Sequence, residues 1–97
     1  MPFTWQININ KQGAGFVYDP NPLNASENDQ IFWSNNDDKV HWPGLPGNDT
    51  YFMEDKIQPG NSSDTFILKG VPKGGSIAYI DSEHPKAPGG KIDVPKT

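Results

Sequence analysis

The stretch FTWQININ, residues 3–10, alternates apolar and polar side chains along its whole length. A period of two is typical of a β-strand that turns one face toward a core and the other toward water. This is the clearest strand signal in the chain. It predicts a strand at residues 3–10 and favours a fold built from β-structure.

Short apolar segments follow at regular intervals, separated by turns rich in Gly, Pro and Asn. Residues 30–34 (QIFWS) carry apolar side chains on both faces, which is typical of a central strand in a sandwich. Residues 43–49, with two Pro and two Gly, predict a loop. The remaining candidates are residues 16–18, 39–42, 51–53, 65–68, 76–80 and 91–94. About seven or eight short strands with frequent turns predict an all-β sandwich or small barrel.

The composition excludes several classes of site and partner. The 97 residues include no Cys, which excludes disulfides, thiolate metal sites, iron–sulfur clusters and cysteine nucleophiles. All eight cationic residues are Lys and the net charge is −4, so we expect no nucleic-acid partner. No apolar run approaches the roughly 20 residues of a membrane span. The length suits a single domain over residues 1–97.

The sequence leaves the localisation open. Residues 1–5 (MPFTW) lack the basic stretch and the following apolar segment of a signal peptide. A cytoplasmic protein fits this feature, and so does a periplasmic or other extracytoplasmic protein in its mature form. In either case we expect a soluble monomer.

Both histidines, His41 and His84, lie beside predicted loops and outside any apolar alternation. Residues 16–41 resemble the first half of plastocyanin-like cupredoxins, with an aromatic residue, a Pro-rich turn, an Ile-Phe-Trp strand, an Asn-rich turn and then a histidine. Residues 58–61 resemble the family's Pro-Gly turn, and residues 79–94 resemble its ligand loop and last strand. The resemblance covers nearly the whole chain and implies a cupredoxin-like Greek-key β-sandwich or barrel.

The same resemblance implies a metal site. Cupredoxins hold one copper ion with a His after the Asn-rich turn and with a Cys, a second His and usually a Met from one loop near the C-terminus. By position, His41 matches the first ligand and His84 the second, while Asp81 occupies the place of the Cys. Gly89 falls at the usual Met position. Two of the four ligands are therefore kept, and a carboxylate replaces the thiolate.

A set of His41, Asp81 and His84 differs in its chemistry from a blue-copper site. The copper–thiolate bond defines the blue site, whereas imidazole and carboxylate donors suit Cu(II), Zn(II) or Ni(II). We expect a non-blue, type-2-like site for Cu(II) or a related divalent ion. Without the thiolate, we do not expect an efficient electron carrier. The predicted function is that of a small metal-binding protein.

Alternatives to a metal site stay open. Asp81 is equally suited to forming a turn, because Asp side chains often accept hydrogen bonds from their own backbone. The chain could then be a metal-free interaction domain that has lost the copper site. The loop with Trp42 and Leu45 could bind a protein or a small molecule, or could cap the sandwich. Neither a nucleophile elbow nor a zinc-protease motif is present, so we expect no enzyme.

Overall fold

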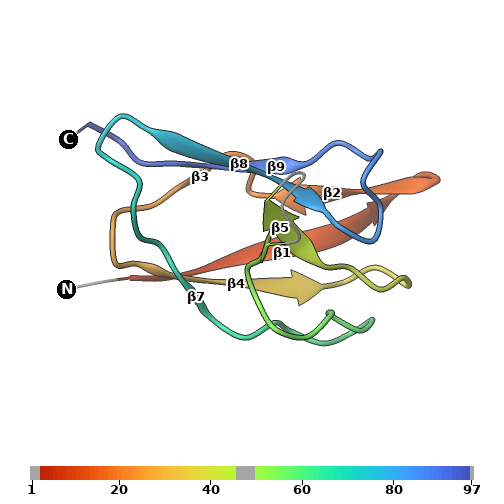
Figure 1. The fold of residues 1–97 in the computed structure, drawn as a ribbon. Coiled ribbons are helices and arrows are strands. Elements are labelled where there is room, and N and C mark those ends of the chain that lie inside the picture. The colour runs from red at the N-terminus through yellow and green to blue at the C-terminus, as the bar shows by residue number, and fades with distance from the viewer. Residues whose placement is uncertain (1–2, 46–49, 97) are drawn as a thin grey trace.

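The computed structural model describes residues 3–45 and 50–96, which form nine strands in two sheets packed as a sandwich (Figure 1). The first sheet has the order β2-β1-β4-β7, with β1 Thr4–Gln12, β2 Gly15–Asp19, β4 Gln30–Asn35 and β7 Phe66–Ile67. The second has the order β3-β9-β8-β5-β6, with β3 Leu23–Asn24, β5 Pro43–Leu45, β6 Thr50–Tyr51, β8 Ser76–Asp81 and β9 Gly90–Asp93. The described residues contain no helix that could cross a membrane. The predicted all-β sandwich is confirmed.

Strand β1 lies inside the first sheet and pairs on both sides. It runs antiparallel to β2 and parallel to β4, with Ile7 opposite Trp33 and Ile9 opposite Asn35. Since side chains alternate along a strand, this register points the apolar residues of both strands toward the second sheet. Ile7, Ile9 and Trp33 are fully buried, as the alternation in residues 3–10 and the central strand predict.

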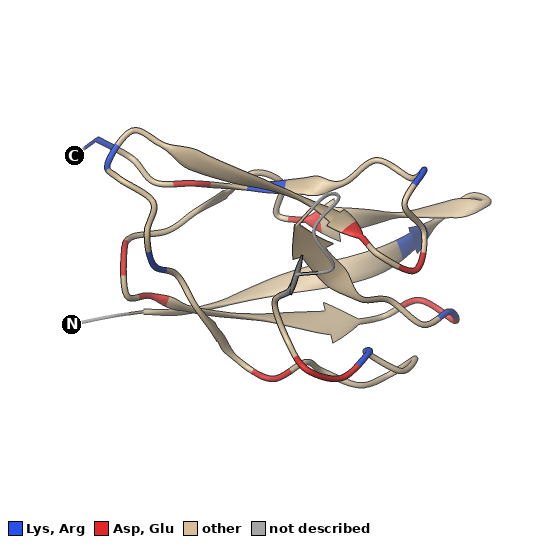
Figure 2. Ribbon diagram, viewed as in Figure 1, with Lys and Arg blue, Asp and Glu red and all other residues tan. Residues whose placement is uncertain are grey.

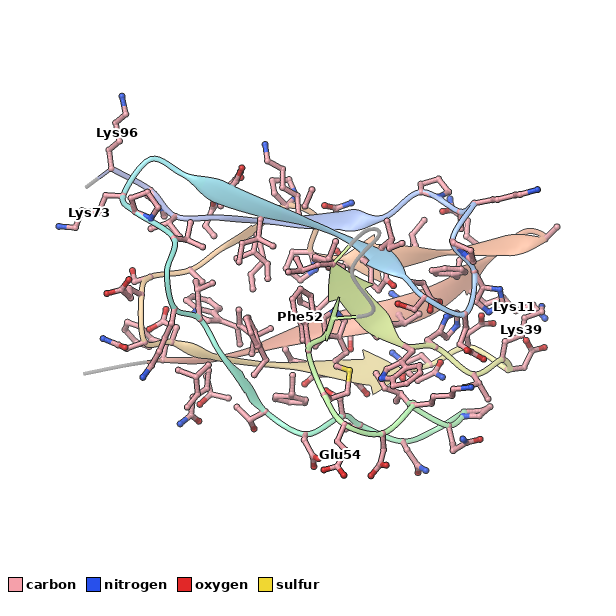
Figure 3. The ribbon with its side chains drawn as sticks, viewed as in Figure 1. Lys11, Lys39, Phe52, Glu54, Lys73 and Lys96 are labelled. Carbon is pink, nitrogen blue, oxygen red and sulfur yellow. The ribbon has the colours of Figure 1, made fainter. Side chains whose placement is uncertain are left out.

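Trp33 lies at the middle of an aromatic core between the sheets. Its ring stacks on Phe52, with centroids 5.1 Å apart, and meets Tyr79 of β8 edge-on at 5.6 Å. Figure 3 shows the Phe52 side chain within the sandwich. Trp5, one of the apolar residues in the alternating stretch 3–10, is only partly buried and packs against the core. The other fully or nearly buried apolar residues are Phe16, Tyr18, Leu23, Ala25, Ile31, Met53, Ile57, Leu68, Val71, Ile92 and Val94.

A buried carboxylate ties the start of β1 to the loop before β4. Asp29 accepts hydrogen bonds from the backbone N–H of Phe3 at 3.0 Å and of Ser26 at 2.9 Å. It also accepts one from Nε1 of Trp5 at 2.8 Å. Burial by itself raises the pKa of Asp29, but these hydrogen bonds outweigh burial and hold the pKa below its usual value. Asp29 is therefore a charged anchor for the first strand.

The predicted strand at residues 39–42 and the predicted loop at 43–49 are wrong in their boundaries. His41 makes only an isolated bridge with Ile57, and the regular strand β5 begins at Pro43. Pro43 can open a strand because the first position needs no ladder donor, and its carbonyl accepts from the N–H of Phe52 at 3.2 Å. Residues 46–49 of the predicted loop lie outside the described residues.

Strands β5 and β8 bring the two histidine segments together. Pro43 of β5 lies opposite Asp81, the last residue of β8. His41, just before β5, and the loop 82–89 after β8 therefore meet at one end of the sandwich. The first and last described residues, Phe3 and Lys96, lie at the opposite end (Figure 1). Figure 2 shows the Lys residues distributed over several strands and loops of the molecule.

Candidate metal centre

A polar turn after β4 places His41 inside the protein. Asn35, fully buried, donates from Nδ2 to the carbonyls of Lys39 at 2.7 Å and Ile57 at 3.0 Å. Its Oδ1 accepts from the backbone N–H of Asp37 at 2.9 Å, which closes the turn. The backbone of His41 then pairs with Ile57 in both directions, at 3.1 and 2.8 Å. These bonds hold a histidine that has no exposed surface.

Both ring nitrogens of His41 contact carboxylates. Nδ1 is in hydrogen-bond contact with Oδ2 of Asp81, and Nε2 lies 2.8 Å from Oδ2 of Asp37. The three side chains are between 0 and 2% exposed. The ring of Phe16 packs against the imidazole, with centroids 4.4 Å apart. The imidazole is therefore held between two buried carboxylates.

Asp81 divides its two oxygens between the turn and the site. Oδ1 accepts hydrogen bonds from the backbone N–H of Trp42 at 2.8 Å and of Glu83 at 3.0 Å. The bond to Glu83, two residues further on, is the turn-forming role that the sequence also allows. Oδ2 faces His41. The two interpretations of Asp81 are compatible, because one carboxylate forms the turn and presents a ligand atom.

His84 comes from the turn that Asp81 begins. Its backbone N–H donates to the carbonyl of Asp81 at 3.0 Å, and its side chain is half-buried. Nε2 lies 3.2 Å from the carbonyl oxygen of Val40, which can only accept, so Nε2 carries a proton. Nδ1 is then the nitrogen of the neutral ring that offers a lone pair. The ring centroid lies 5.1 Å from that of His41.

The structure brings together the three residues predicted as metal ligands. One ligand atom from each of His41, Asp81 and His84 lies within 4.8 Å of the others. Two imidazole nitrogens and one carboxylate oxygen suit a divalent ion such as Cu(II) or Zn(II). They do not fit a blue-copper ion, because the chain has no Cys to supply a thiolate. The group is a candidate site for a divalent ion.

A proton competes with a metal ion for this group. Burial lowers the pKa of His41, but the hydrogen bonds to Asp81 and Asp37 and the charges of both carboxylates more than offset burial. The pKa of His41 therefore lies above its ordinary value. Protonated His41 donates from both nitrogens and so satisfies both carboxylates. A metal ion at Nδ1 must displace that proton.

The arrangement of strands is similar to that of solved copper proteins. Amicyanin from Paracoccus versutus (Thiobacillus versutus) matches 94% of this chain over 80% of its own length, with a TM-score of 0.69 and 16% sequence identity. A methionine-to-alanine variant of amicyanin with Cu(I) matches 94% of this chain over 81% of its own, at the same TM-score and identity. This is the cupredoxin fold. No protein-family model and no curated protein matches the sequence.

The backbone leaves no room for a side chain at position 89, which the sequence resemblance matches to the axial methionine of cupredoxins. A Cβ atom at Gly89 would overlap the carbonyl oxygen of Tyr79, and one at Gly90 would overlap the Tyr79 side chain. Glycine is required where two backbone segments approach this closely. A side chain at position 89 therefore cannot be added unless β8 or the following loop moves. Packing therefore leaves no room for a side chain at position 89 in this backbone.

The loop at the ligand end of the cupredoxin fold is tied to the sandwich. Nε1 of Trp42 donates to the carbonyl of Met53 at 3.1 Å, and the Lys56 ammonium lies 5.3 Å from the centre of the indole. Lys56 also forms an ion pair at 3.2 Å with Glu83, which belongs to the loop 82–89 after β8. Trp42 and Leu45 are both half-buried. These contacts support the capping role; a partner at this loop stays a hypothesis.

Asp37 belongs to this site, although the sequence does not single it out as a site residue. The run Asn35-Asn36-Asp37-Asp38 predicts a turn, and the structure confirms that Asn35 and Asp37 form one. The available signal is spacing, since a carboxylate four residues before a candidate ligand can return to it across a turn. The sequence does not show which of the two neighbouring Asp residues turns inward.

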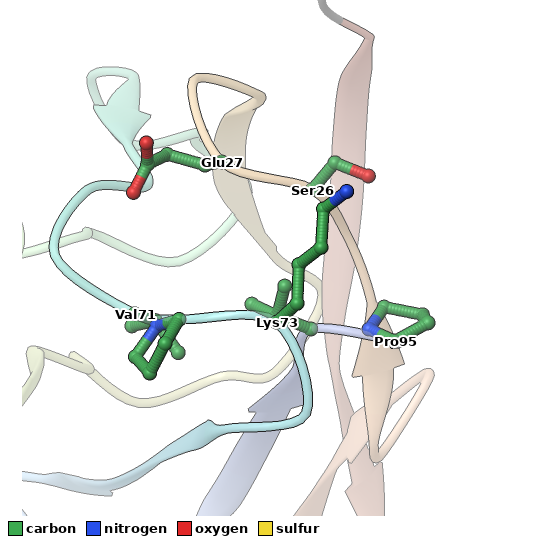
Figure 4. A pocket seen from close by; sticks show the side chains of 7 residues that line it. Ser26, Glu27, Val71, Lys73 and Pro95 are labelled. Carbon is green, nitrogen blue, oxygen red and sulfur yellow. The ribbon is translucent and has the colours of Figure 1, made fainter. Parts of the chain in front are cut away.

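A pocket of about 330 Å³ lies elsewhere in the molecule (Figure 4). Lys73 lines this pocket. Figure 3 shows Lys73 and Lys96 at one end of the molecule and Lys39, two residues before His41, at the other end. The two charged residues of the pocket, Glu27 and Lys73, are exposed. The pocket is therefore separate from the candidate metal centre. Its lining residues are Ser26, Glu27, Val71, Pro72, Lys73, Val94 and Pro95.

Proposed function

We propose that this protein binds one divalent ion, Cu(II) foremost, at a non-blue site made by His41, Asp81 and His84. The observation that carries the proposal is the convergence of one ligand atom from each residue within 4.8 Å. Two of the three residues are buried and held by backbone hydrogen bonds, so little ordering remains to be done on binding. Residues 1–97 act as one domain that contains the whole site.

The donor set favours capture of a metal over electron transfer. Imidazole and carboxylate ligands stabilise Cu(II) relative to Cu(I), whereas the thiolate of a blue site accommodates both states. Changing the charge of the ion in a site without sulfur therefore requires more rearrangement of its ligands. The proposed role is to hold or deliver the divalent ion, and no catalysis is part of it.

Calorimetric titration with Cu(II) and with Zn(II) tests the proposal. Metal-stripped wild type is compared with His84→Ala, which removes a half-buried ligand at the surface, and with the His41→Ala, His84→Ala double variant. Glu83→Gln is the matched control, because Glu83 is a neighbouring carboxylate that pairs with Lys56 outside the ligand group. Circular dichroism confirms that each variant is folded.

We expect one-to-one, sub-micromolar binding by wild type and Glu83→Gln, with binding weakened at least about 100-fold in His84→Ala. Equal binding by wild type and His84→Ala contradicts the assigned ligands. No binding by wild type contradicts the function itself.

A metal-free interaction domain is the second candidate, and one observation favours it. The direct contact between Asp81 and His41 satisfies both buried groups without an ion. The titration separates the two candidates. An unchanged melting temperature of wild type in the presence of Cu(II) and Zn(II) supports the metal-free domain.

A further inference from the structure

We propose that Asp37 is a positioning residue of the metal centre, and that its buried charge makes the site selective for divalent over monovalent ions. The inference rests on the proposed function, because it concerns the same site. Asp37 contacts His41 at Nε2, on the side of the ring opposite Asp81.

Two carboxylates, those of Asp81 and Asp37, determine the orientation of the His41 ring. Asp81 faces the Nδ1 side of the ring, and Asp37 lies 2.8 Å from Nε2. A neutral imidazole has one N–H and one lone pair, and a carboxylate can only accept. With the proton held at Nε2 by Asp37, the lone pair at Nδ1 points toward Asp81 and the metal position. A carboxylate behind a ligating histidine also increases its basicity toward the metal.

The second step is that Asp37 cannot turn away. Its Oδ1 accepts from the backbone N–H of Asp38 at 2.8 Å, and its own N–H donates to Oδ1 of Asn35 at 2.9 Å. Asn35 is itself held by the carbonyls of Lys39 and Ile57. The Asp37 side chain is 2% exposed, so water does not compete for it. The turn therefore fixes both the carboxylate and the ring that it contacts.

The third step is the balance of charge. Asp37 and Asp81 place two negative charges on opposite sides of one buried imidazole. With His41 and His84 neutral, a divalent ion compensates both carboxylates, whereas Cu(I) leaves one buried charge uncompensated. An uncompensated buried charge is strongly unfavourable. Asp37 should therefore lower the Cu(II)/Cu(I) reduction potential without touching the ion.

A pair of neighbouring carboxylates provides the test. Asp37→Asn removes the buried charge while its amide oxygen can still accept from Nε2 of His41. Asp38→Asn is the matched control, because the Asp38 side chain is 61% exposed and pairs with Lys11 and Lys39 at the surface. Cu(II), Zn(II) and Cu(I) affinities are measured for each protein by chelator competition.

We expect Asp37→Asn to weaken Cu(II) and Zn(II) binding by about 10- to 100-fold and to weaken Cu(I) binding less, so that the reduction potential rises. Asp38→Asn should match wild type within about twofold, as expected for a screened surface charge. Equal affinities and potentials in the two variants overturn the charge role of Asp37.

NMR of the wild-type protein tests the positioning role without depending on the folding of any variant. In ¹⁵N-histidine NMR of the Zn(II)-loaded protein, His41 should bind the metal through Nδ1 and keep a slowly exchanging proton on Nε2. Metal bound at Nε2, or a rapidly exchanging Nε2 proton, overturns the positioning role. These results are distinguishable from failure of the proposed function, in which wild type binds no metal; that outcome overturns both.

Discussion

Oδ2 of Asp81 is in direct contact with Nδ1 of His41, and neither side chain has any exposed surface. A carboxylate thus faces His41 from position 81, which the sequence resemblance matches to the thiolate ligand of cupredoxins. Both a proton and a divalent ion can join these two groups, because each binds the lone pair at Nδ1. The proposed metal site therefore requires that a divalent ion replace the proton at this position.

Replacing Asp81 with Cys should convert a weakly coloured Cu(II) protein into a strongly coloured one. The thiolate supplies the copper–sulfur bond that defines a blue site, and His41 and His84 already supply two nitrogens. Visible absorption spectra of wild type and Asp81→Cys with one equivalent of Cu(II) check this prediction.

Asp81→Ser is the control, because Ser is similar in size to Cys but has no thiolate. The Cu(II)-loaded Asp81→Ser protein should stay weakly coloured. An intense visible band in wild type, or a copper-loaded Asp81→Cys protein without one, contradicts the assignment of position 81.

The metal-free protein should lose stability as the pH rises above the ordinary range of histidine. The pKa of His41 is higher in the folded protein than the value of about 6.5 expected after unfolding. The stabilisation by its charged form is therefore complete below about pH 6.5 and is lost as the pH rises through the folded-state pKa. Each unit of difference corresponds to about 1.4 kcal/mol.

Urea unfolding in a chelator between about pH 6 and pH 9 measures this effect. Asp37→Asn should reduce the pH dependence, because it removes one of the two carboxylates that stabilise the charged ring. His84→Ala should retain it. Stability that is constant or increases over this range is the opposite of what we expect. Metal affinity should rise over the same range, by about tenfold per pH unit while the proton still competes.

Gly89→Ala should destabilise the protein by about 3 kcal/mol, at the upper end of the cost of overpacking. The new Cβ atom overlaps a backbone oxygen, that of Tyr79, which no side-chain rotation can relieve. Gly15→Ala is the control, because its Cβ atom would lie 3.9 Å from the carbonyl oxygen of Gln12, an ordinary van der Waals contact. Thermal and urea unfolding compare the variants. Equal stabilities show that the loop after β8 adapts.

Asp29→Asn should destabilise the protein by about 2 kcal/mol at neutral pH, because a buried charged acceptor is lost. The pKa of Asp29 is lowered, so its contribution is present above about pH 3.9 and disappears as the pH falls through the lower folded-state pKa. The difference between variant and wild type should therefore shrink in acid. Asp64→Asn, at an exposed carboxylate, is the control, and a loss equal to that of Asp29→Asn would contradict the anchoring role.

Local patterns predicted much of the fold. The alternation in residues 3–10 predicts β1, and the apolar run with Trp33 predicts the central strand β4. The boundaries near His41 were not predictable, because Pro43 acts as a turn signal in the sequence and as the first residue of β5 in the structure. Pairing with Asp81 of β8, which is distant in sequence, decides that outcome.

The candidate metal site also combines residues that the sequence predicted with one that it did not. The resemblance to cupredoxins pointed to His41, Asp81 and His84, and the structure places their ligand atoms together. Asp37 was not predicted, because nothing local distinguishes it from Asp38, which is at the surface. The difference comes from Asn35, whose buried side chain closes the turn and directs Asp37 inward.

The sequence by itself determined which chemistry is excluded: without Cys there is no thiolate to bind copper. It also determined the β-class, because alternation is a local property. Only the tertiary structure decided that His41 lies between two carboxylates, one of them 40 residues away. The physical reason is that burial and strand pairing, rather than neighbours in the sequence, determine which polar groups are removed from water. Such groups must then form hydrogen bonds with each other.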